Sequence, residues 1–150
     1  MWRELAEQDI KDTLSEREFE SYTKAAEGPG WDPGAVGRIL GRTAELVRGY
    51  IASSPRGVRF NPSPRFLPPS LIGPAADYAA VTLLRRIPKD IRKERLDARN
   101  EAIKLFEAVA EGKTAVEPDS EDALTTTGAG PAELVSSTTP RLTPDQLAGL

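Results

Sequence analysis

The sequence predicts an all-α protein: a small bundle of four to five helices with a long extended C-terminal tail that ends in a short helix. Apolar residues recur at intervals of three and four through much of residues 1–113, and several of these runs open with a capping residue or a proline. The composition then changes abruptly at Thr114. We therefore expect a helical body over residues 1–113 and an extended C-terminal tail over residues 114–150.

The most apolar stretch of the chain, residues 71–87, predicts a central and largely buried helix. The segment Pro68-Pro69-Ser70 supplies a stop, a rigid turn and an N-cap in front of it. Asp77 is the only charged residue between Ser70 and Leu84, so the helix is apolar nearly all round. Such a helix belongs in the middle of a fold.

A second, longer helix follows Pro88. Proline removes a backbone donor and restricts the residue before it, so we expect a kink or turn there before a helix restarts at Asp90. Gly112 is well placed as its C-terminal cap. Basic residues mixed with acidic ones gather around this break. Because the signs are mixed, we favour an ordinary solvated face, with a partner-facing basic patch as the alternative. They are Arg85, Arg86, Lys89, Arg92, Lys93, Arg95 and Arg99.

Shorter patterns precede the central helix. Apolar residues in the first ten positions fit a short first turn or helix. Ser15 and Glu18 have the spacing of a capping box, which predicts a helix over about residues 16–26, and Leu14 and Phe19 can form a hydrophobic staple. The apolar face of this helix, which we expect to pack in the core, comprises Phe19, Tyr22 and Thr23.

The next helix should begin after the Gly28-Pro29-Gly30 break, with Asp32 as N-cap and Pro33 in the first position, and end near Ala52 or Ser53. Its glycines are costly, each about 1 kcal/mol worse than alanine in a helix interior. A close approach by another helix would explain them. A phosphate-binding loop is the alternative, but no strand precedes the glycines and they lie inside the helical pattern. They are Gly34, Gly37 and Gly41.

A proline-rich loop over residues 53–67 interleaves arginines with aromatic residues. This pattern can bind nucleic acid or an acidic protein surface. We favour a solvated loop whose phenylalanines pin it to the body, although long loops in compact domains are often functional. The candidate partner-contact residues are Arg56, Arg59, Phe60, Arg65 and Phe66.

The composition excludes several classes of function. With no cysteine and no histidine, the chain can form no disulfide, no thiol nucleophile, no imidazole metal site and no Ser-His-Asp triad. We therefore expect neither catalysis nor a cofactor. The net charge of −3 argues against general binding of nucleic acid. Because no segment resembles a signal peptide or a membrane span, we expect a soluble protein without membrane contact.

Residues 114–140 are dominated by Thr, Ser, Gly, Pro and acidic residues, which cannot offset the ordering entropy without a partner. At the end of the chain, Thr143, Pro144 and Gln146 have the spacing of a helix start. A capped amphipathic turn on a long tether indicates a docking peptide, with a frayed terminus as the alternative. The candidate docking residues are Pro140, Arg141, Leu142, Leu147 and Leu150.

Two classes of function remain from these residues. One is an assembly protein in which the body and the tail each contact neighbouring subunits. The other is a regulatory adaptor that binds nucleic acid through the arginine-rich region 56–99.

A family resemblance favours the first class. Residues 88–92, 94–96, 101–105 and 110–113, preceded by residues 14–18 and 47–50 and followed by residues 140–150, resemble the Mu-like prophage gp36 family in the same order along the chain. The chain departs from that pattern in its longer, proline-rich loop 53–67 and at Pro144, where a basic residue is common.

The resemblance implies a small helical connector between the head and tail of a tailed bacteriophage, placed in the neck of the virion and assembled in the bacterial host cytoplasm. The subunits would form a ring, a dodecamer, beneath the portal protein. This ring would extend the channel for passing double-stranded DNA and present a platform to a head-closure, stopper or tail-terminator protein. A ring needs two different complementary patches on each subunit, and a body with a separate docking tail would supply them.

Overall fold

The computed structural model describes residues 1–119 of the chain. Its helices are α1 (Glu7–Thr13), α2 (Glu16–Glu27), α3 (Ala35–Ala52), α4 (Pro69–Leu84) and α5 (Lys93–Ala110). Two short strands, β1 (Arg3–Glu4) and β2 (Phe66–Leu67), form an antiparallel pair. The predicted all-α fold class is therefore confirmed. The short helix predicted at the end of the tail lies outside the described residues.

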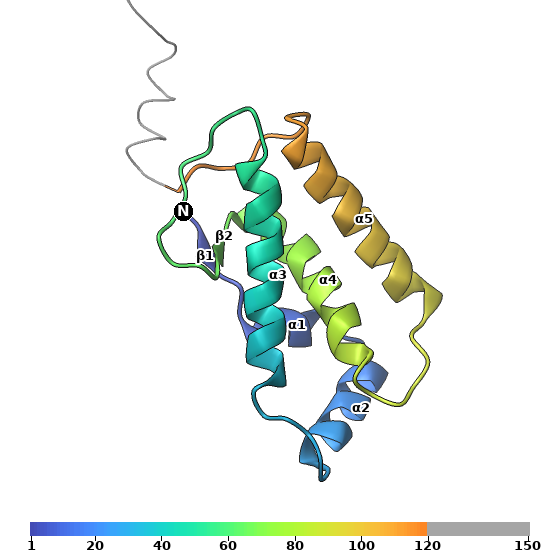
Figure 1. The fold of residues 1–150 in the computed structure, drawn as a ribbon. Helices are drawn as coiled ribbons and strands as arrows, with labels where there is room; N and C mark the ends of the chain where they lie inside the picture. Colours follow the sequence, from blue (N-terminus) through green and yellow to red (C-terminus); the bar gives the residue numbers. More distant parts are fainter. Residues whose placement is uncertain (120–150) are drawn as a thin grey trace, which may run out of the picture.

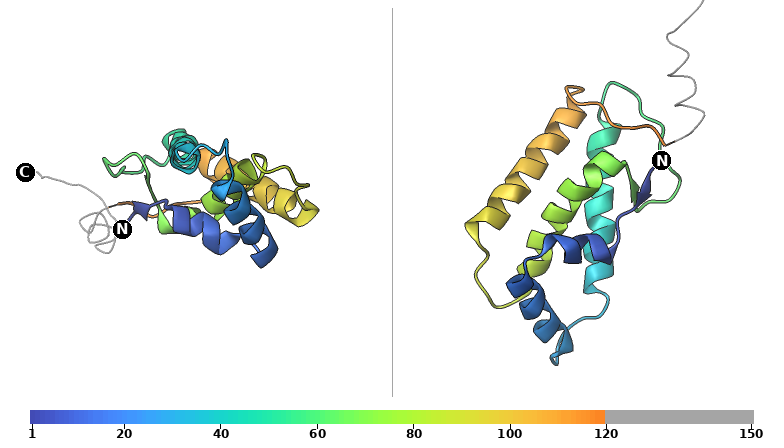
Figure 2. Two further views of the ribbon diagram at one scale, coloured as in Figure 1. Left: turned by 90° about the horizontal axis from the view of Figure 1, so that it is seen from below. Right: turned by 180° about the vertical axis from the view of Figure 1, so that it is seen from behind.

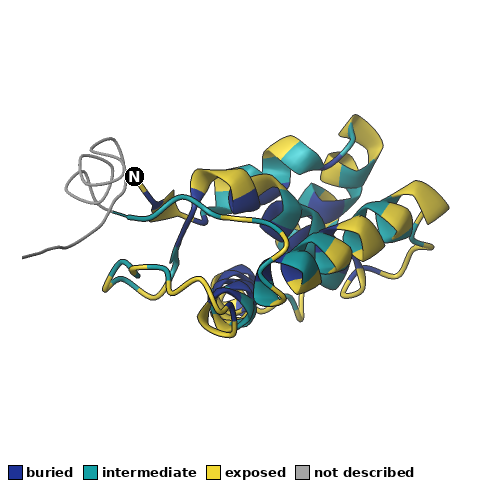
Figure 3. Ribbon diagram, turned by 90° about the horizontal axis from the view of Figure 1, so that it is seen from above, coloured by how far each residue is buried: buried dark blue, intermediate teal, exposed yellow. Residues whose placement is uncertain are grey.

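Helix α4 is the centre of the fold. It runs between α3 and α5, while α1 crosses behind it (Figure 1). Seen from below, α3 lies on one side of α4, and α1 and α2 lie on the other (Figure 2). Its buried side chains confirm the predicted central helix; they are Leu71, Ile72, Ala75, Ala76, Ala79, Ala80, Val81, Leu83 and Leu84. The surrounding helices turn buried faces inward and exposed faces outward, as amphipathic helices do (Figure 3).

The start of α4 differs from the prediction. Pro68 occupies the N-cap position and Pro69 the first helical position, so Ser70 lies inside the helix and does not cap it. A proline at the first position has a backbone already set for a helix and loses no hydrogen bond there. The Ser70 hydroxyl instead donates to Glu117 Oε1 at 2.7 Å, a partner supplied by the far end of the body.

The predicted helix start at Asp90 is also wrong. Helix α4 ends at Leu84, before Pro88, and α5 begins only at Lys93, with Arg92 as its N-cap. Ile87, which the sequence placed in the helix, is buried outside it, and Ile91 packs against the core from the same connection. These two side chains draw the connection onto the body, which keeps it out of helical geometry.

The end of α5 follows the prediction at Gly112. Gly112 has φ +80°, a left-handed conformation that favours glycine. Its N–H donates to Val109 O at 3.0 Å, and the N–H of Lys113 donates to Ala108 O at 2.9 Å. These two hydrogen bonds form a Schellman motif, which satisfies the last carbonyl groups of the helix.

Helix α2 has the predicted capping box but not the predicted face. The Ser15 N–H donates to Glu18 Oε1 at 2.8 Å, and the Glu18 N–H donates to Ser15 Oγ at 3.3 Å. Tyr22 is buried and meets Trp31 edge-on at 5.8 Å, but Phe19 is 41 % exposed. Because Glu18 and Tyr22 point inward, Phe19, about 100° round the helix from Glu18, points outward. The expected core position of Phe19 is therefore wrong.

Helix α3 begins at Ala35, later than predicted, because Asp32 does not cap it. Asp32 Oδ1 accepts a hydrogen bond from the Gly34 N–H at 2.9 Å, and the same carboxylate pairs with Arg38. The explanation of the glycines by a close helix approach is also wrong. No atom lies within 4 Å of the position that a Cβ would take at Gly37 or Gly41.

Replacing Gly37 or Gly41 by alanine should stabilise the body by about 0.5–1 kcal/mol each, because alanine loses less backbone entropy in a helix and both sites have room for a methyl group. Urea unfolding followed by circular dichroism measures this. The matched control is Gly112→Ala, which should destabilise, because φ is +80° there and the new Cβ would lie 2.9 Å from Pro55 Cγ. Lower stability in both α3 variants would contradict the open environment described for these sites.

Candidate interaction surfaces

The last described residues lie against the body beside the N-terminus (Figure 1). Trp2 Nε1 donates to Glu117 O at 2.7 Å, and the Trp2 N–H donates to Asp119 Oδ1 at 2.7 Å. Asn61 Nδ2 donates to Asp119 Oδ2 at 2.6 Å. We call Trp2, Asn61, Glu117 and Asp119 the terminal clasp. Because Trp2 is 2 % exposed, the clasp holds the chain firmly past Lys113, the end of the predicted body, as far as Asp119.

Arg48 of α3 packs against the clasp. Its guanidinium lies 5.0 Å from the ring centre of Phe60 and 5.7 Å from that of Trp2. Burial lowers the pKa of Arg48, and Asp119 partly opposes this. The same guanidinium donates three hydrogen bonds of 2.6–2.9 Å to carbonyl oxygens of the loop, those of Asn61, Ser63 and Phe66. Arg48 therefore fixes the loop 53–67 to the body, a role that the sequence did not indicate.

The predicted loop residues make contacts with the body. Phe60 packs edge-on against Trp2 at 5.4 Å, and Phe66 lies in β2. Arg65 forms an ion pair with Glu4 at 3.3 Å and donates a hydrogen bond to the backbone oxygen of Leu5, the residue after β1. The two remaining arginines, Arg56 and Arg59, are exposed. Arg56 Nε nevertheless donates a hydrogen bond to Gly112 O at 2.8 Å. The phenylalanines thus hold the loop on the body, as we expected.

The predicted docking residues of the tail are Pro140, Arg141, Leu142, Leu147 and Leu150, and they lie outside the described residues.

The basic run around Pro88 is divided between the interior and the surface. Arg95 is 10 % exposed; it pairs with Glu18 at 2.6 Å and donates to Thr13 O at 3.0 Å. Arg99 lies over the ring of Tyr78 at 4.8 Å. The other members are exposed: Arg85, Arg86, Lys89, Arg92 and Lys93. Two of the seven charges therefore serve the internal structure.

The Arg95 ion pair joins three helices. Burial alone would raise the pKa of Glu18, but hydrogen bonds from Arg95 and from Ser15 outweigh it and hold this pKa at about 2. Burial raises the pKa of Asp77 on α4, and Arg95, at 3.9 Å, only partly offsets the effect. The pair therefore fixes α2 and α5 to the centre of the fold as charged groups at neutral pH.

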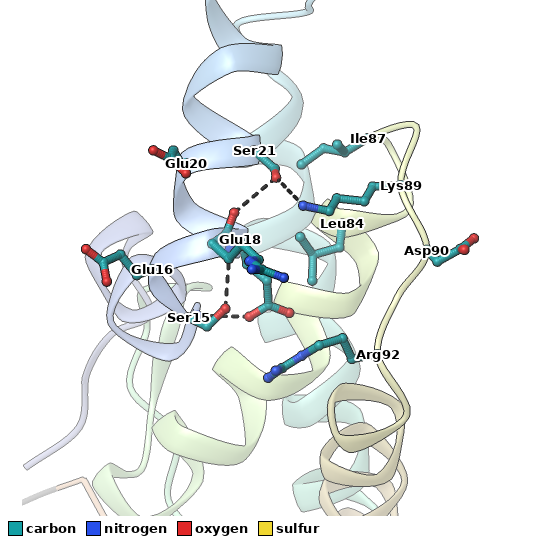
Figure 4. A pocket seen from close by; sticks show the side chains of 11 residues that line it. Ser15, Glu16, Glu18, Glu20, Ser21, Leu84, Ile87, Lys89, Asp90 and Arg92 are labelled. Atoms are coloured by element: carbon teal, nitrogen blue, oxygen red, sulfur yellow. Dashed lines mark hydrogen bonds between the residues drawn. The ribbon is translucent and has the colours of Figure 1, made fainter.

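A groove of ≈ 450 Å³ lies between α2 and the connection from α4 to α5. Leu84 and Ile87 line its apolar part (Figure 4). Lys89 Nζ donates to Ser21 Oγ at 3.0 Å across it. A lysine amine becomes a reactive group when the lysine is desolvated. Because Lys89 is exposed, its contact with Ser21 is an ordinary surface hydrogen bond.

A smaller groove of ≈ 260 Å³ lies between α3 and α4, and we call it the basic groove. Its arginines are Arg38, Arg42 and Arg86, and its remaining lining is apolar or carries hydroxyl groups: Ile39, Thr43, Leu46, Tyr78 and Thr82. The sequence did not predict this groove. The signal was present in two rows with a spacing of four residues: Arg38 and Arg42 on α3, and Tyr78 and Thr82 on α4 continued by Arg86 just after its end.

Residues 1–119 contain no group of three or more acidic side chains placed to hold a metal ion. In this part of the chain, no helix combines the length and the apolar character needed to cross a membrane.

Comparisons with known proteins give no assignment: no family model, no curated protein and no solved structure matches this chain.

Proposed function

We propose that the protein is a structural component of the neck of a tailed bacteriophage, a connector that forms a ring beneath the portal protein. In this proposal the ring is a dodecamer that matches the portal. It extends the channel for passing double-stranded DNA, which it does not bind sequence-specifically, and it offers a platform to a head-closure, stopper or tail-terminator protein. The subunit is made in the bacterial host cytoplasm and ends in the virion.

The terminal clasp is the observation that carries the proposal furthest. It holds the chain against the helical body as far as Asp119, and residues 120–150 follow this point in the sequence. Those 31 residues can span at most about 110 Å and include the docking residues predicted from the sequence. A closed body with a separate tether is suited to joining two neighbours at once, which a ring on a platform requires.

The charges weigh against the nucleic-acid adaptor. Residues 1–119 carry nineteen basic and nineteen acidic side chains, so the body has no net attraction for phosphate groups. Arg65 and Arg56, two members of the arginine-rich region, hydrogen-bond to the body itself. A neutral body would also let DNA pass through a ring without retaining it.

A chain that ends after Asp119 tests the proposal. It keeps the terminal clasp, so its melting curve should match that of the full chain, while its association with the portal protein of the same phage should be lost. Light scattering coupled to size exclusion measures the mass of each mixture. Full-length chains with Leu142, Leu147 and Leu150 replaced by aspartate are the second variant, and they should also fail to bind.

The control for the clasp is a chain that ends at Val116. It lacks Glu117 and Asp119, and it should melt at a lower temperature. Normal portal association by the chain that ends at Asp119 would refute the docking role of the tail. No association by the full chain, together with salt-sensitive retention on DNA, would favour the nucleic-acid adaptor.

A further inference from the structure

The charges of the body are separated along the chain. Residues 1–32 carry nine acidic and four basic side chains, whereas residues 33–119 carry ten acidic and fifteen basic ones. A body that is neutral overall therefore has an acidic N-terminal part and a basic remainder. Such a distribution favours specific contacts between unlike surfaces over a general attraction to a polyanion.

The basic groove is the receiving half of such a contact. Arg38 is paired with Asp32, whereas the side chain of Arg42 has no hydrogen-bond or ion-pair partner in residues 1–119. The side chain of Arg86 attracts Asp32 only at longer range, without an ion pair. The apolar part of the groove is formed by Leu46 and Tyr78, which are half-buried, and by Ile39, which is 5 % exposed. Its chemistry therefore suits an apolar side chain flanked by carboxylates.

Helix α2 presents such a side chain. Phe19 is 41 % exposed, and within the described chain only Met1 is another large hydrophobic residue as open to solvent. Three exposed glutamates lie within about 40° of one another on the neighbouring face of α2, and none has an ion-pair partner in residues 1–119; they are Glu16, Glu20 and Glu27. We call these three the glutamate stripe. Arg17 and Lys24 border its other side.

The two surfaces belong to opposite sides of the molecule. Helix α3, which supplies two arginines of the groove, lies across α4 from α2 (Figure 2). Figure 4 shows Glu16 and Glu20 on the side of α2 that faces away from Lys89 and Arg92, although both glutamates also border the groove of ≈ 450 Å³. One copy therefore cannot satisfy its own groove with its own stripe, but a second copy can.

We propose that Phe19 and the glutamate stripe of one copy dock into the basic groove of the next copy, so that copies associate head to tail. The inference rests on the proposed ring and names the contact that builds it. Two different patches that repeat from copy to copy form a ring when the rotation closes. Phe19 enters between Ile39, Leu46 and Tyr78, while the glutamates meet Arg42 and Arg86.

A second copy fits the groove better than the other ligands that arginines attract. The groove, at ≈ 260 Å³, is smaller than the about 300–1,000 Å³ of clefts that hold small molecules. Duplex DNA would need an extended basic track, whereas the carboxylate of Asp32, just before α3, already pairs with Arg38 of this groove. A short apolar and acidic surface matches both its size and its charge.

A charge swap tests the contact on the full chain. Arg42→Glu with Arg86→Glu reverses the groove, and Glu20→Lys with Glu27→Lys reverses the stripe. Sedimentation velocity of the protein alone should show self-association of the wild type that weakens at high salt. The association constant should fall roughly tenfold or more in each double variant and in Phe19→Ala. Association should return in the fourfold variant and in an equal mixture of the two double variants.

Lys104→Glu is the matched control, because Lys104 is an exposed charge on α5 outside both surfaces. It should leave self-association unchanged, and circular dichroism should show that every variant keeps its helices. A monomeric wild type, or double variants that associate normally, would overturn the inference. Portal binding separates the two proposals. If charge reversal does not change self-association and the protein still binds the portal, only this contact is refuted. If the charge swap restores self-association but the protein does not bind the portal, only the proposed function is refuted.

Discussion

Arginine in place of Ala79 should unfold the helical body. Ala79 is 0 % exposed in the middle of α4, and the neighbouring helices α1, α3 and α5 all pack on this helix. A guanidinium there would lose its hydration without gaining a partner, and its volume would push the packed helices apart. These costs together reach the about 5–15 kcal/mol that hold a typical domain folded. Circular dichroism should show loss of the cooperative thermal transition.

The control for this substitution is arginine at an exposed position of the same helix. Gly73 is exposed, and no atom lies within 4 Å of the position of a Cβ there. Gly73→Arg should therefore leave the melting temperature unchanged or raise it, because arginine favours a helix more than glycine does. An unchanged melting curve for Ala79→Arg would refute the central position of α4.

Breaking the pair between Glu18 and Arg95 should give the second largest loss. Their side chains are 11 % and 10 % exposed, so removing either one leaves the other charge buried. Such a change typically costs about 3–5 kcal/mol. We expect Glu18→Gln and Arg95→Met each to lower the free energy of unfolding by this amount in urea. The double variant should regain part of it, and additive losses would show that the two side chains do not interact.

The same pair predicts how stability depends on pH. The pKa of Glu18 is about 2 in the folded chain and about 4.3 when unfolded, so folding favours the ionised form. Its contribution, about 3 kcal/mol, should be fully present above about pH 4.5 and should decline as the pH falls toward 2. Urea unfolding at a series of pH values should show this loss in the wild type and a smaller one in Glu18→Gln. Equal losses in both proteins would assign the acid sensitivity to other carboxylates.

Local chemistry explains what the sequence could predict of the fold. The capping box of Ser15 and Glu18 and the left-handed Gly112 both depend on residues a few positions away, and both were predicted correctly. The apolar composition of α4 likewise sufficed to place it at the centre. Each of these features is complete within its own segment.

The errors arose where a distant residue competes for a side chain. Ser70 has the chemistry of an N-cap but bonds to Glu117, and Asp32 is taken by Arg38 and a turn. Arg95, far along the chain, pulls Glu18 inward and so turns Phe19 outward. A periodic pattern shows that a helix has two faces, but such long-range partners decide which face is buried.

The same difference between local signals and long-range partners decided which parts of the interaction surfaces could be predicted. The phenylalanines of the loop 53–67 were correctly expected to hold it to the body, because large aromatic side chains rarely stay in solvent. Arg48 was missed because its three acceptors are backbone oxygens, which carry no sequence signal. The basic groove was missed because it exists only when two helices, separate in the sequence, lie side by side.

The two tryptophans, the only ones in the chain, give each end of the molecule its own optical probe. Trp2 lies in the terminal clasp beside Arg48, near the end of α3, while Trp31 meets Tyr22 just before α3 begins. The part of α3 from Ala35 to Arg48 separates them by about 20 Å. In Trp31→Phe the intrinsic fluorescence would follow only the opening of the clasp. In Trp2→Phe it would follow only the neighbourhood of α2, so tail release and subunit contact could be timed separately in one assembling mixture.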